Sequence, residues 1–284
     1  VPPLRILGDV HVDVASMSVG TYNFEHYFQM VVDRASRRFW VQLLRLKGEC
    51  IQALIWWHAW ARANKPNHPV VQFTVDGAYS TKVLIAHCKT WGITLNVSSA
   101  HTQSAWLSER GIGLLREMMM PSLSTSGCNL HNWGDNVIHN TFLLNKLGTS
   151  ALPNGVTRND AFNLEEISDE AAKLLASRPV PSREEDVWGC EAMVKVAGGK
   201  FQGTKCEQQA VPHIYFGKSD AFNGKLVQNL RTGRRFDTKN AKLNSSVFPC
   251  KDPSYRALTT KMRAVAEEAS LQTLGVTLRL LLSA

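Results

Sequence analysis

The sequence predicts a mixed α/β domain followed by a small all-β domain. Three observations support this fold class: closely spaced apolar runs near the N-terminus, alternating helix-like and strand-like segments after residue 48, and short β-like runs separated by glycines after residue 187. The 284 residues are enough for two hydrophobic cores, and 44% of them are hydrophobic, which excludes a disordered chain.

Three strands are expected first. Residues 4–16 form a largely apolar run, and similar runs over 26–33 and 38–46 follow, with a turn-like RASR segment between the last two. Because such short links join neighbouring antiparallel strands, these segments predict a meander.

Helices and strands alternate after this meander. Apolar residues recur at helical spacing from residue 48, Gly92 closes a second such segment, and Gly111 and Gly113 weaken a third by about 1 kcal/mol each. In order, the predicted elements are a helix over 48–64, a strand over 70–76, a helix over 80–92, a strand over 93–100, and helices over 104–120 and 132–147. The order β-β-β-α-β-α-β-α-α predicts a mixed five-stranded sheet with flanking helices.

The second half of the chain divides differently. An acidic, partly helical segment that ends in prolines is expected to be a linker, and the glycine-separated runs beyond it predict a small β-barrel. We therefore expect a core domain over 1–160, a linker over 161–186, a barrel over 187–250 and a C-terminal tail over 251–284.

The charge balance favours a polyanionic partner. The chain has 32 basic and 24 acidic residues, a net charge of +8, and a sequence pI near 9.3. No run reaches the roughly 18 apolar residues of a membrane span, so no such span is predicted.

The cysteines exclude two common classes of small domain. They are far apart and form no CxxC pair, so neither a zinc ribbon nor a dense disulfide framework is predicted. Cys128, His131 and His139 are scattered candidates for a metal site, and small buried thiols in an intracellular, reducing compartment are the favoured interpretation. The six cysteines are Cys50, Cys88, Cys128, Cys190, Cys206 and Cys250.

Three acidic residues fall at informative positions on this scaffold. Asp13 lies in the first predicted strand, Asp76 ends the fourth, and Glu109 lies on the helix after the fifth. If the first and fourth strands are adjacent, the three carboxylates converge and could hold two Mg²⁺ or Mn²⁺ ions for phosphoryl transfer. The structural alternatives are that Asp76 begins a turn and that Glu109 pairs with Arg110 or Arg116 on a solvated helix face.

The residues around these acids resemble one known family. His11–Met17 is similar to the block that opens the catalytic core of copia-type (Pseudoviridae) LTR retrotransposon integrases. Between Asp76 and Glu109 lie 32 residues, three fewer than in that family, and the missing residues fall inside two blocks. The other similar core blocks, in family order, are Tyr27–Asp33, Ser36–Arg37, Trp40–Val41, Asp76–Tyr79, Gly92–Ile93, His101–Thr102, Glu109–Arg110 and Leu143–Lys146. The blocks resembling the domain that follows the core are Val187–Cys190, His213–Gly217 and Arg231–Phe248.

This resemblance implies both a fold and a site. It implies an RNase H-like mixed five-stranded sheet with flanking helices, followed by an SH3-like β-barrel. It also implies that Asp13, Asp76 and Glu109 are the catalytic residues and hold two Mg²⁺ or Mn²⁺ ions. The residues expected to contact nucleic acid are His101, Lys47, Arg231, Arg234, Arg235 and Lys239. For the barrel residues the alternative is a solvated hairpin, and for His11 a structural strand histidine and an active-site role are both open.

Departures from the family pattern leave two functions open. Ser16–Met17 stands where the family has Gly-Pro, and Gln103–Leu107 replaces a polar Pro-Gln-Gln-Asn-Gly loop. The first hypothesis is an active, nuclear integrase that joins retroelement ends to target DNA, as a homo-oligomer. The second is a domesticated, catalytically inactive scaffold bound to protein partners in a larger assembly, in an unassigned or organellar compartment. A nucleic-acid-binding module that uses only the basic barrel is a third, and the tryptophans 56, 57 and 60 are expected in a core or interface.

Overall fold

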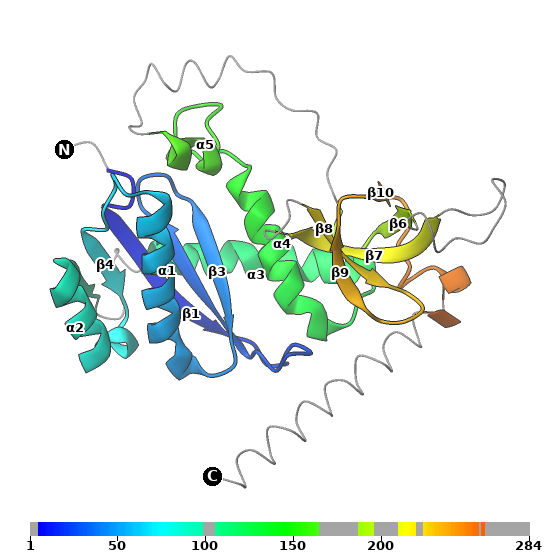
Figure 1. The fold of residues 1–284 in the computed structure, drawn as a ribbon, viewed down its shortest axis with the longest axis horizontal. Coiled ribbons are helices and arrows are strands. Elements are labelled where there is room, and N and C mark those ends of the chain that lie inside the picture. Colours follow the sequence, from blue (N-terminus) through cyan, green and yellow to red (C-terminus); the bar gives the residue numbers. More distant parts are fainter. Residues whose placement is uncertain are drawn as a thin grey trace, which may run out of the picture. The chain divides into compact units, whose positions relative to one another are not determined.

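The computed structural model describes residues 5–98, 106–164, 187–195, 210–219, 224–255 and 257–258 (Figure 1). The chain forms two compact units. The described residues of the first unit are 5–18, 25–98, 106–117 and 140–164, and the remainder, including 19–24 and 118–139, belong to the second. His101, most of the expected linker and most of the expected tail lie outside the described residues.

The first unit contains a five-stranded sheet with the order β3-β2-β1-β4-β5. β1 pairs antiparallel with β2 and β2 with β3, whereas β1 pairs parallel with β4 and β4 with β5. The antiparallel meander and the mixed RNase H-like sheet predicted from the sequence are therefore confirmed. The strands are β1 (Asp9–Ser16), β2 (Tyr27–Asp33), β3 (Phe39–Leu44), β4 (Gln72–Val75) and β5 (Thr94–Val97).

Helices cover both faces of this sheet (Figure 1). On one face, Val10 and Val12 of β1 are buried in a core shared with Leu54 and Trp57 of α1 and with Leu84 of α2. α3 lies on the opposite face, where a Cβ at Gly111 would come 3.1 Å from Phe39 Cε1. The helices are α1 (Cys50–Asn64), α2 (Lys82–Trp91), α3 (Trp106–Ser126), α4 (Trp133–Asn145) and α5 (Arg158–Asn163).

Two boundaries differ from the sequence predictions by five residues or more. α3 continues to Ser126, six residues beyond the predicted end, and contains Pro121 as well as both glycines. Gly111 fits because the helix backbone packs closely on Phe39, so tertiary contact outweighs the low helix propensity of glycine. β1 begins at Asp9 instead of residue 4, because Leu7 has a φ of 59° inside a turn that precedes the strand.

The second unit is built on an all-antiparallel sheet with the order β10-β6-β7-β8-β9. Its core includes Cys190, Ala192, Tyr215 and Val227. This architecture is consistent with the expected SH3-like domain. The strands are β6 (Glu191–Lys195), β7 (Ala210–Ser219), β8 (Gly224–Asn229), β9 (Arg235–Thr238) and β10 (Ala241–Asn244).

Two further features bear on the expectations above. α5 places Phe162 in the core of the first unit, inside the range expected for the linker. Within the part of the chain that the structure describes, no helix combines the length and apolar character needed to cross a membrane.

Candidate active site

The register between β1 and β4 places two of the three predicted acids side by side. Asp9 pairs with Gln72 and His11 with Thr74, a constant offset of 63 positions along two parallel strands. The same offset places Asp76, the residue directly after β4, beside Asp13. Because side chains alternate along a strand, Asp13 and Asp76 also point to the same face of the sheet, the face that α3 covers.

Each of these aspartates is held by a backbone N–H. The N–H of Val14 donates to Asp13 Oδ1 at 2.7 Å. The N–H of Ala78 donates to Asp76 Oδ1 at 3.0 Å, so Asp76 caps a short 3₁₀ turn, Gly77–Tyr79. The turn interpretation of Asp76 is therefore correct, and it leaves the second carboxylate oxygen for another contact.

The third predicted acid, Glu109, lies within electrostatic reach of Asp13. Burial raises the pKa of Asp13 above its usual range, and the charges of Asp76 and Glu109 raise it further. Glu109 is exposed in the first turn of α3, and Arg116 of that helix donates instead to the carbonyl of Ser16 at 3.3 Å. The structure thus brings the three carboxylates into one neighbourhood.

The carboxylates do not form a closed metal site in this arrangement. Among the described residues, no three Asp, Glu, His or Cys side chains lie close enough to hold one ion. The donor chemistry nevertheless fits, because Mg²⁺ and Mn²⁺ prefer carboxylate oxygens and several such oxygens are present.

Positive charge and a buried hydroxyl lie beside the acids. Lys47 is exposed in the turn before α1, and its charge lowers the pKa of Asp13. Tyr79 is buried, and its hydroxyl donates to Gln29 Oε1 at 3.2 Å. Burial raises the pKa of Tyr79, as do the nearby Cys50, Asp13 and Asp76, so Tyr79 stays protonated.

Gln29 connects Tyr79 to the body of the first unit. Gln29 Nε2 donates to Gln42 Oε1 at 3.3 Å, and Gln42 Nε2 donates to the carbonyl of Ala53 at 3.1 Å. This chain of hydrogen bonds ties the turn that holds Asp76 to β2, β3 and α1. Gln29 and Gln42 were not predicted from the sequence. The one available signal was a polar residue inside a mostly buried strand.

His11 takes a structural part in this arrangement. The ring is buried, and Nε2 lies 3.4 Å from Asp9 Oδ2, to which Arg34 also donates at 3.0 Å. Burial opposes ionisation of Asp9, but the hydrogen bonds and charge of His11, Arg34 and Thr74 outweigh it and lower the pKa of Asp9 to about 2. His11 therefore supports Asp9 and the β1–β4 pair.

The predicted contacts in the second unit fall into two groups. Arg231, Arg234 and Lys239 are exposed around β9. Arg235, in contrast, donates to Asp135 Oδ2 and Asn132 Oδ1, both at 2.7 Å. Its guanidinium therefore links β9 to the start of α4 inside that unit.

The remaining candidates do not form a site. Cys128 Sγ lies 3.6 Å from Cys250 Sγ, and His131 Nδ1 lies 2.6 Å from the carbonyl oxygen of Gly20. Cys128, His131 and His139 are not grouped as metal ligands. Among the three tryptophans of α1, Trp57 is buried, Trp60 is 38% exposed and Trp56 is 66% exposed, so only Trp57 is a core residue throughout.

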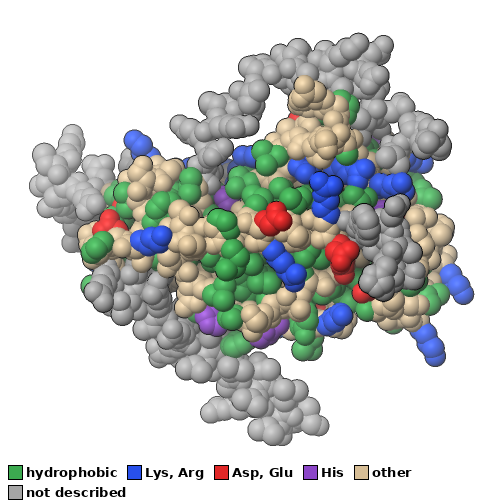
Figure 2. Space-filling view, turned by 180° about the vertical axis from the view of Figure 1, so that it is seen from behind, with side chains coloured by type: hydrophobic (Ala, Val, Ile, Leu, Met, Phe, Trp, Pro, Cys, Tyr) green, Lys and Arg blue, Asp and Glu red, His purple; other side chains and the backbone are tan. Residues whose placement is uncertain are grey.

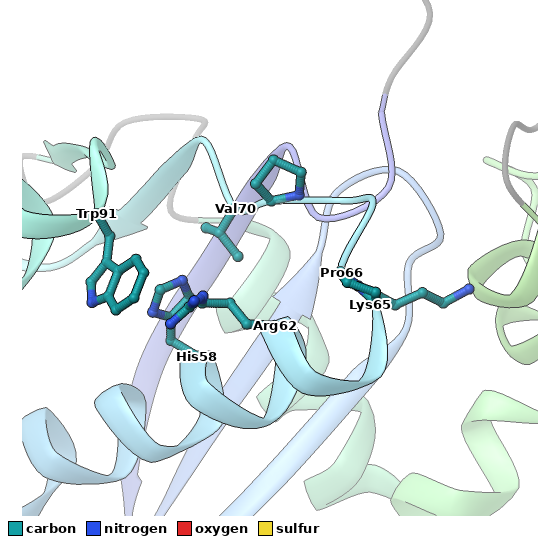
Figure 3. Close-up of a pocket in the computed structure, with 7 residues that line it drawn as sticks. His58, Arg62, Lys65, Pro66, Val70 and Trp91 are labelled. Atoms are coloured by element: carbon teal, nitrogen blue, oxygen red, sulfur yellow. The ribbon is translucent and has the colours of Figure 1, made fainter.

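A separate hollow of about 160 Å³ opens beside the C-terminal end of α1 (Figure 3). Arg62 lies over the ring of Trp91, 3.4 Å from its centre, and the ammonium of Lys65 points away from these side chains. The hollow is lined by His58, Arg62, Lys65, Pro66, Pro69, Val70 and Trp91. It contains no carboxylate and none of the predicted catalytic residues.

Comparison with known proteins agrees with the resemblance noted in the sequence. No family model matches the chain. Over 221 residues it is 25% identical to the retrovirus-related Pol polyprotein from transposon TNT 1-94 of Nicotiana tabacum, a match that covers 76% of this chain and 15% of the polyprotein. The chain thus spans a small part of that relative's length. The predicted similarity to copia-type integrases is confirmed by this match.

Two solved structures also match. They are the trimeric and dimeric forms of the HTLV-2 integrase catalytic core domain, each in complex with magnesium. The sequence identities are 18% and 17%, the TM-scores 0.42 and 0.41, and the matches cover 56% and 57% of this chain and 99% of each core domain. The fold assignment rests on the strand order and pairing described above.

Proposed function

We propose that this chain is an integrase-like polynucleotidyl transferase, which joins DNA ends of a retroelement to a target DNA. The observation that supports the proposal is the β1–β4 register, which places Asp76 beside Asp13, together with the effect of the Glu109 charge on Asp13. Similarity to a retrotransposon Pol polyprotein supports the same assignment.

The acids would hold Mg²⁺ or Mn²⁺. When bound, such ions activate an attacking oxygen and stabilise the leaving oxygen of a phosphodiester. The chain's own residues orient the ligands: the N–H groups of Val14 and Ala78 fix one oxygen of Asp13 and Asp76. Tyr79, anchored on Gln29, holds the turn that presents Asp76.

The reaction requires no nucleophile from the protein. The oxygen of a DNA 3′-hydroxyl, or of water during end processing, forms a new bond to phosphorus as the bond to the old 3′-oxygen breaks. The attacking oxygen loses its proton to solvent and the departing 3′-oxygen gains one, so the numbers of atoms and charges balance. Lys47, exposed beside Asp13, adds positive charge where a phosphate would approach.

A strand-transfer assay with Asp76→Asn tests the proposal. The variant keeps a side-chain oxygen for the Ala78 N–H but loses a charged ligand, so we expect Mn²⁺-dependent activity to fall by at least about 100-fold, about 2.7 kcal/mol of barrier. DNA binding measured without divalent metal should persist. The exposed Asp237→Asn is the matched control and should retain activity. Equal activity in wild type and Asp76→Asn would reject the proposal.

A non-catalytic architectural role is the second candidate. It is favoured by one observation, that no three metal-binding side chains among the described residues lie close enough to hold one ion. This role predicts no metal-dependent cleavage by the purified chain and stable co-purification with protein partners. A monomer, shown by gel filtration, that cleaves DNA with Mn²⁺ would exclude it.

A further inference from the structure

Three arginines from separate elements lie within electrostatic reach of one another, and one of them packs on Phe39. Gly111 brings the backbone of α3 onto the Phe39 ring, and Arg110 is the residue that precedes it. The Arg158 guanidinium of α5 lies 5.1 Å from the centre of the same ring. Arg37 precedes Phe39 by two residues, in the turn between β2 and β3. We call Arg37, Arg110 and Arg158 the arginine cluster.

Phe39 is held firmly in the fold. Its backbone N–H donates to Asn145 Oδ1 at 2.9 Å, and Asn145 Nδ2 donates to its carbonyl at 2.8 Å. Arg158 is buried, and its Nη1 donates to the carbonyls of Leu144 and Leu147 at the end of α4. Arg158 is therefore fixed by the fold, and it provides a permanent positive charge behind the other two arginines.

Arg37 and Arg110 have no such internal partner. Among the described residues, neither side chain forms an ion pair or a hydrogen bond with another group. The nearest acid in sequence, Asp33, is buried and already accepts from the N–H of Leu7 and the hydroxyl of Ser36. Among the described residues, no carboxylate forms an ion pair with these three arginines, although Asp33 lies close enough to act on the charge of Arg37.

The fold holds these like charges together at a cost. Burial lowers the pKa of Arg158, and the charges of Arg110 and Arg37 lower it further. Burial likewise lowers the pKa of Arg37, and the charges of Arg34 and Arg110 lower it further, while the charge of Asp33 opposes them. Arg34 forms an ion pair with Asp9, so its charge is compensated. In the arginine cluster, by contrast, an external anion would reduce the repulsion between the positive charges.

We propose that Arg37 and Arg110, supported by Arg158, bind backbone phosphates of the nucleic-acid strand that enters the carboxylate site. Guanidinium groups match phosphate oxygens with two parallel hydrogen bonds. Arg110 directly follows Glu109 on α3, so the arginine cluster begins one residue away from the proposed carboxylate site. Figure 2, which views the molecule from the side opposite Figure 1, shows several Lys and Arg side chains on that face of the molecule. The inference rests on the proposed function for the identity of the anion.

Salt-dependent DNA binding tests this inference without any chemistry. The double variant Arg37→Gln/Arg110→Gln removes two cations from the arginine cluster. Arg62→Gln/Lys89→Gln is the matched control, because it removes two cations from α1 and α2, which pack on the other face of the sheet. Affinity for a fluorescein-labelled single-stranded oligonucleotide is measured by fluorescence anisotropy over a KCl series in EDTA.

We expect the slope of log affinity against log salt to be less steep in the cluster variant by about 1.4, which is about 0.7 for each lost phosphate contact. Its affinity at low salt should fall by at least about tenfold, while the control keeps the wild-type slope. Circular dichroism melts establish that both double variants are folded. Equal losses in the two double variants would overturn the inference. The inference would also be overturned if polyglutamate bound to the arginine cluster more tightly than the oligonucleotide does. That result would identify an acidic protein as the partner.

Failure of this inference is distinguishable from failure of the proposed function. If the cluster variant binds DNA as wild type does, yet Mn²⁺-dependent cleavage requires Asp76, the inference is wrong and the function stands. If the slope changes as expected but wild type cleaves nothing with Mn²⁺, the strand-binding surface stands and the catalytic assignment is wrong.

Discussion

The two faces of β1 perform different tasks. Val10 and Val12 point to the side of α1 and α2, where they are buried in an apolar core. Asp9 and Asp13 point to the side of α3, where burial is incomplete and polar partners surround them. Because side chains alternate along a strand, one short segment can anchor a sheet and also present acids.

This difference has an energetic consequence. Burial of apolar area on the valine side changes little with pH by itself, but it strongly disfavours any charge placed there. The α3 side depends on charges, so its energies should change with protons, cations and anions. A titratable group buried on the valine side is therefore the severest test of the comparison.

His58 is such a group. It packs on Phe73 and shares a 2.9 Å hydrogen bond with His87. Burial, followed by the charges of His87 and Arg62, lowers the pKa of His58 to about 4. The folded protein keeps His58 neutral while the unfolded chain binds a proton below about 6.5, so stability should fall by up to about 3 kcal/mol as pH drops from 6.5 to 4.

Urea unfolding between these pH values measures the effect. His58→Gln should flatten the decline, whereas His26→Gln, at an exposed position, should leave it unchanged. If wild type and His58→Gln lose the same stability over this range, charge is not excluded from the valine side. The proposed difference between the two faces of β1 would then be wrong.

Asp9 tests the α3 side, with a smaller expected effect. Its pKa of about 2 lies below the usual value of 3.8, because His11, Arg34 and Thr74 outweigh burial. The carboxylate therefore stabilises the fold by about 2 kcal/mol above pH 3.8, and this contribution disappears as pH falls towards 2. Asp9→Asn should cost about that much at neutral pH and almost nothing near pH 2, by urea unfolding at both.

The exposed Asp237→Asn serves as the control for Asp9. A loss in Asp9→Asn that is the same at both pH values would mean that packing, and not charge, explains the role of Asp9. His11→Gln should remove part of the same stabilisation, since His11 is the strongest partner.

The sequence predicted the antiparallel meander and the mixed five-stranded sheet for a physical reason. Hydrophobic periodicity and short links are local signals, and two parallel strands in a fixed register bring Asp13 and Asp76 together without further information. The arginine cluster had no such signal. It depends on the approach of Gly111 to Phe39, a contact between residues 72 positions apart that periodicity does not encode.

The division of α3 and α4 was also beyond the sequence. Residues 118–139 belong to the second unit, although they continue helices whose other ends belong to the first. Periodicity predicts that a helix exists, whereas the choice of which core each turn joins depends on partners distant in the chain. Trp133, for example, is buried and donates to the carbonyl of Val19 at 2.8 Å.

Tyr79 gives the test with the smallest expected effect, because it connects the two faces of the first sheet. Its hydroxyl donates to buried Gln29, while its turn presents Asp76. Tyr79→Phe should cost about 1 kcal/mol of stability, since Gln29 Oε1 loses this donor. Gln29→Met should cost a similar amount, and the double variant less than the sum by about 1 kcal/mol if the hydrogen bond is the shared term. Additive losses would mean that the two side chains act independently.

If the hydrogen bond also holds the turn, Tyr79→Phe should lower kcat for Mn²⁺-dependent cleavage with little change in KM, because Asp76 then fails to reach its catalytic position while the DNA contacts remain.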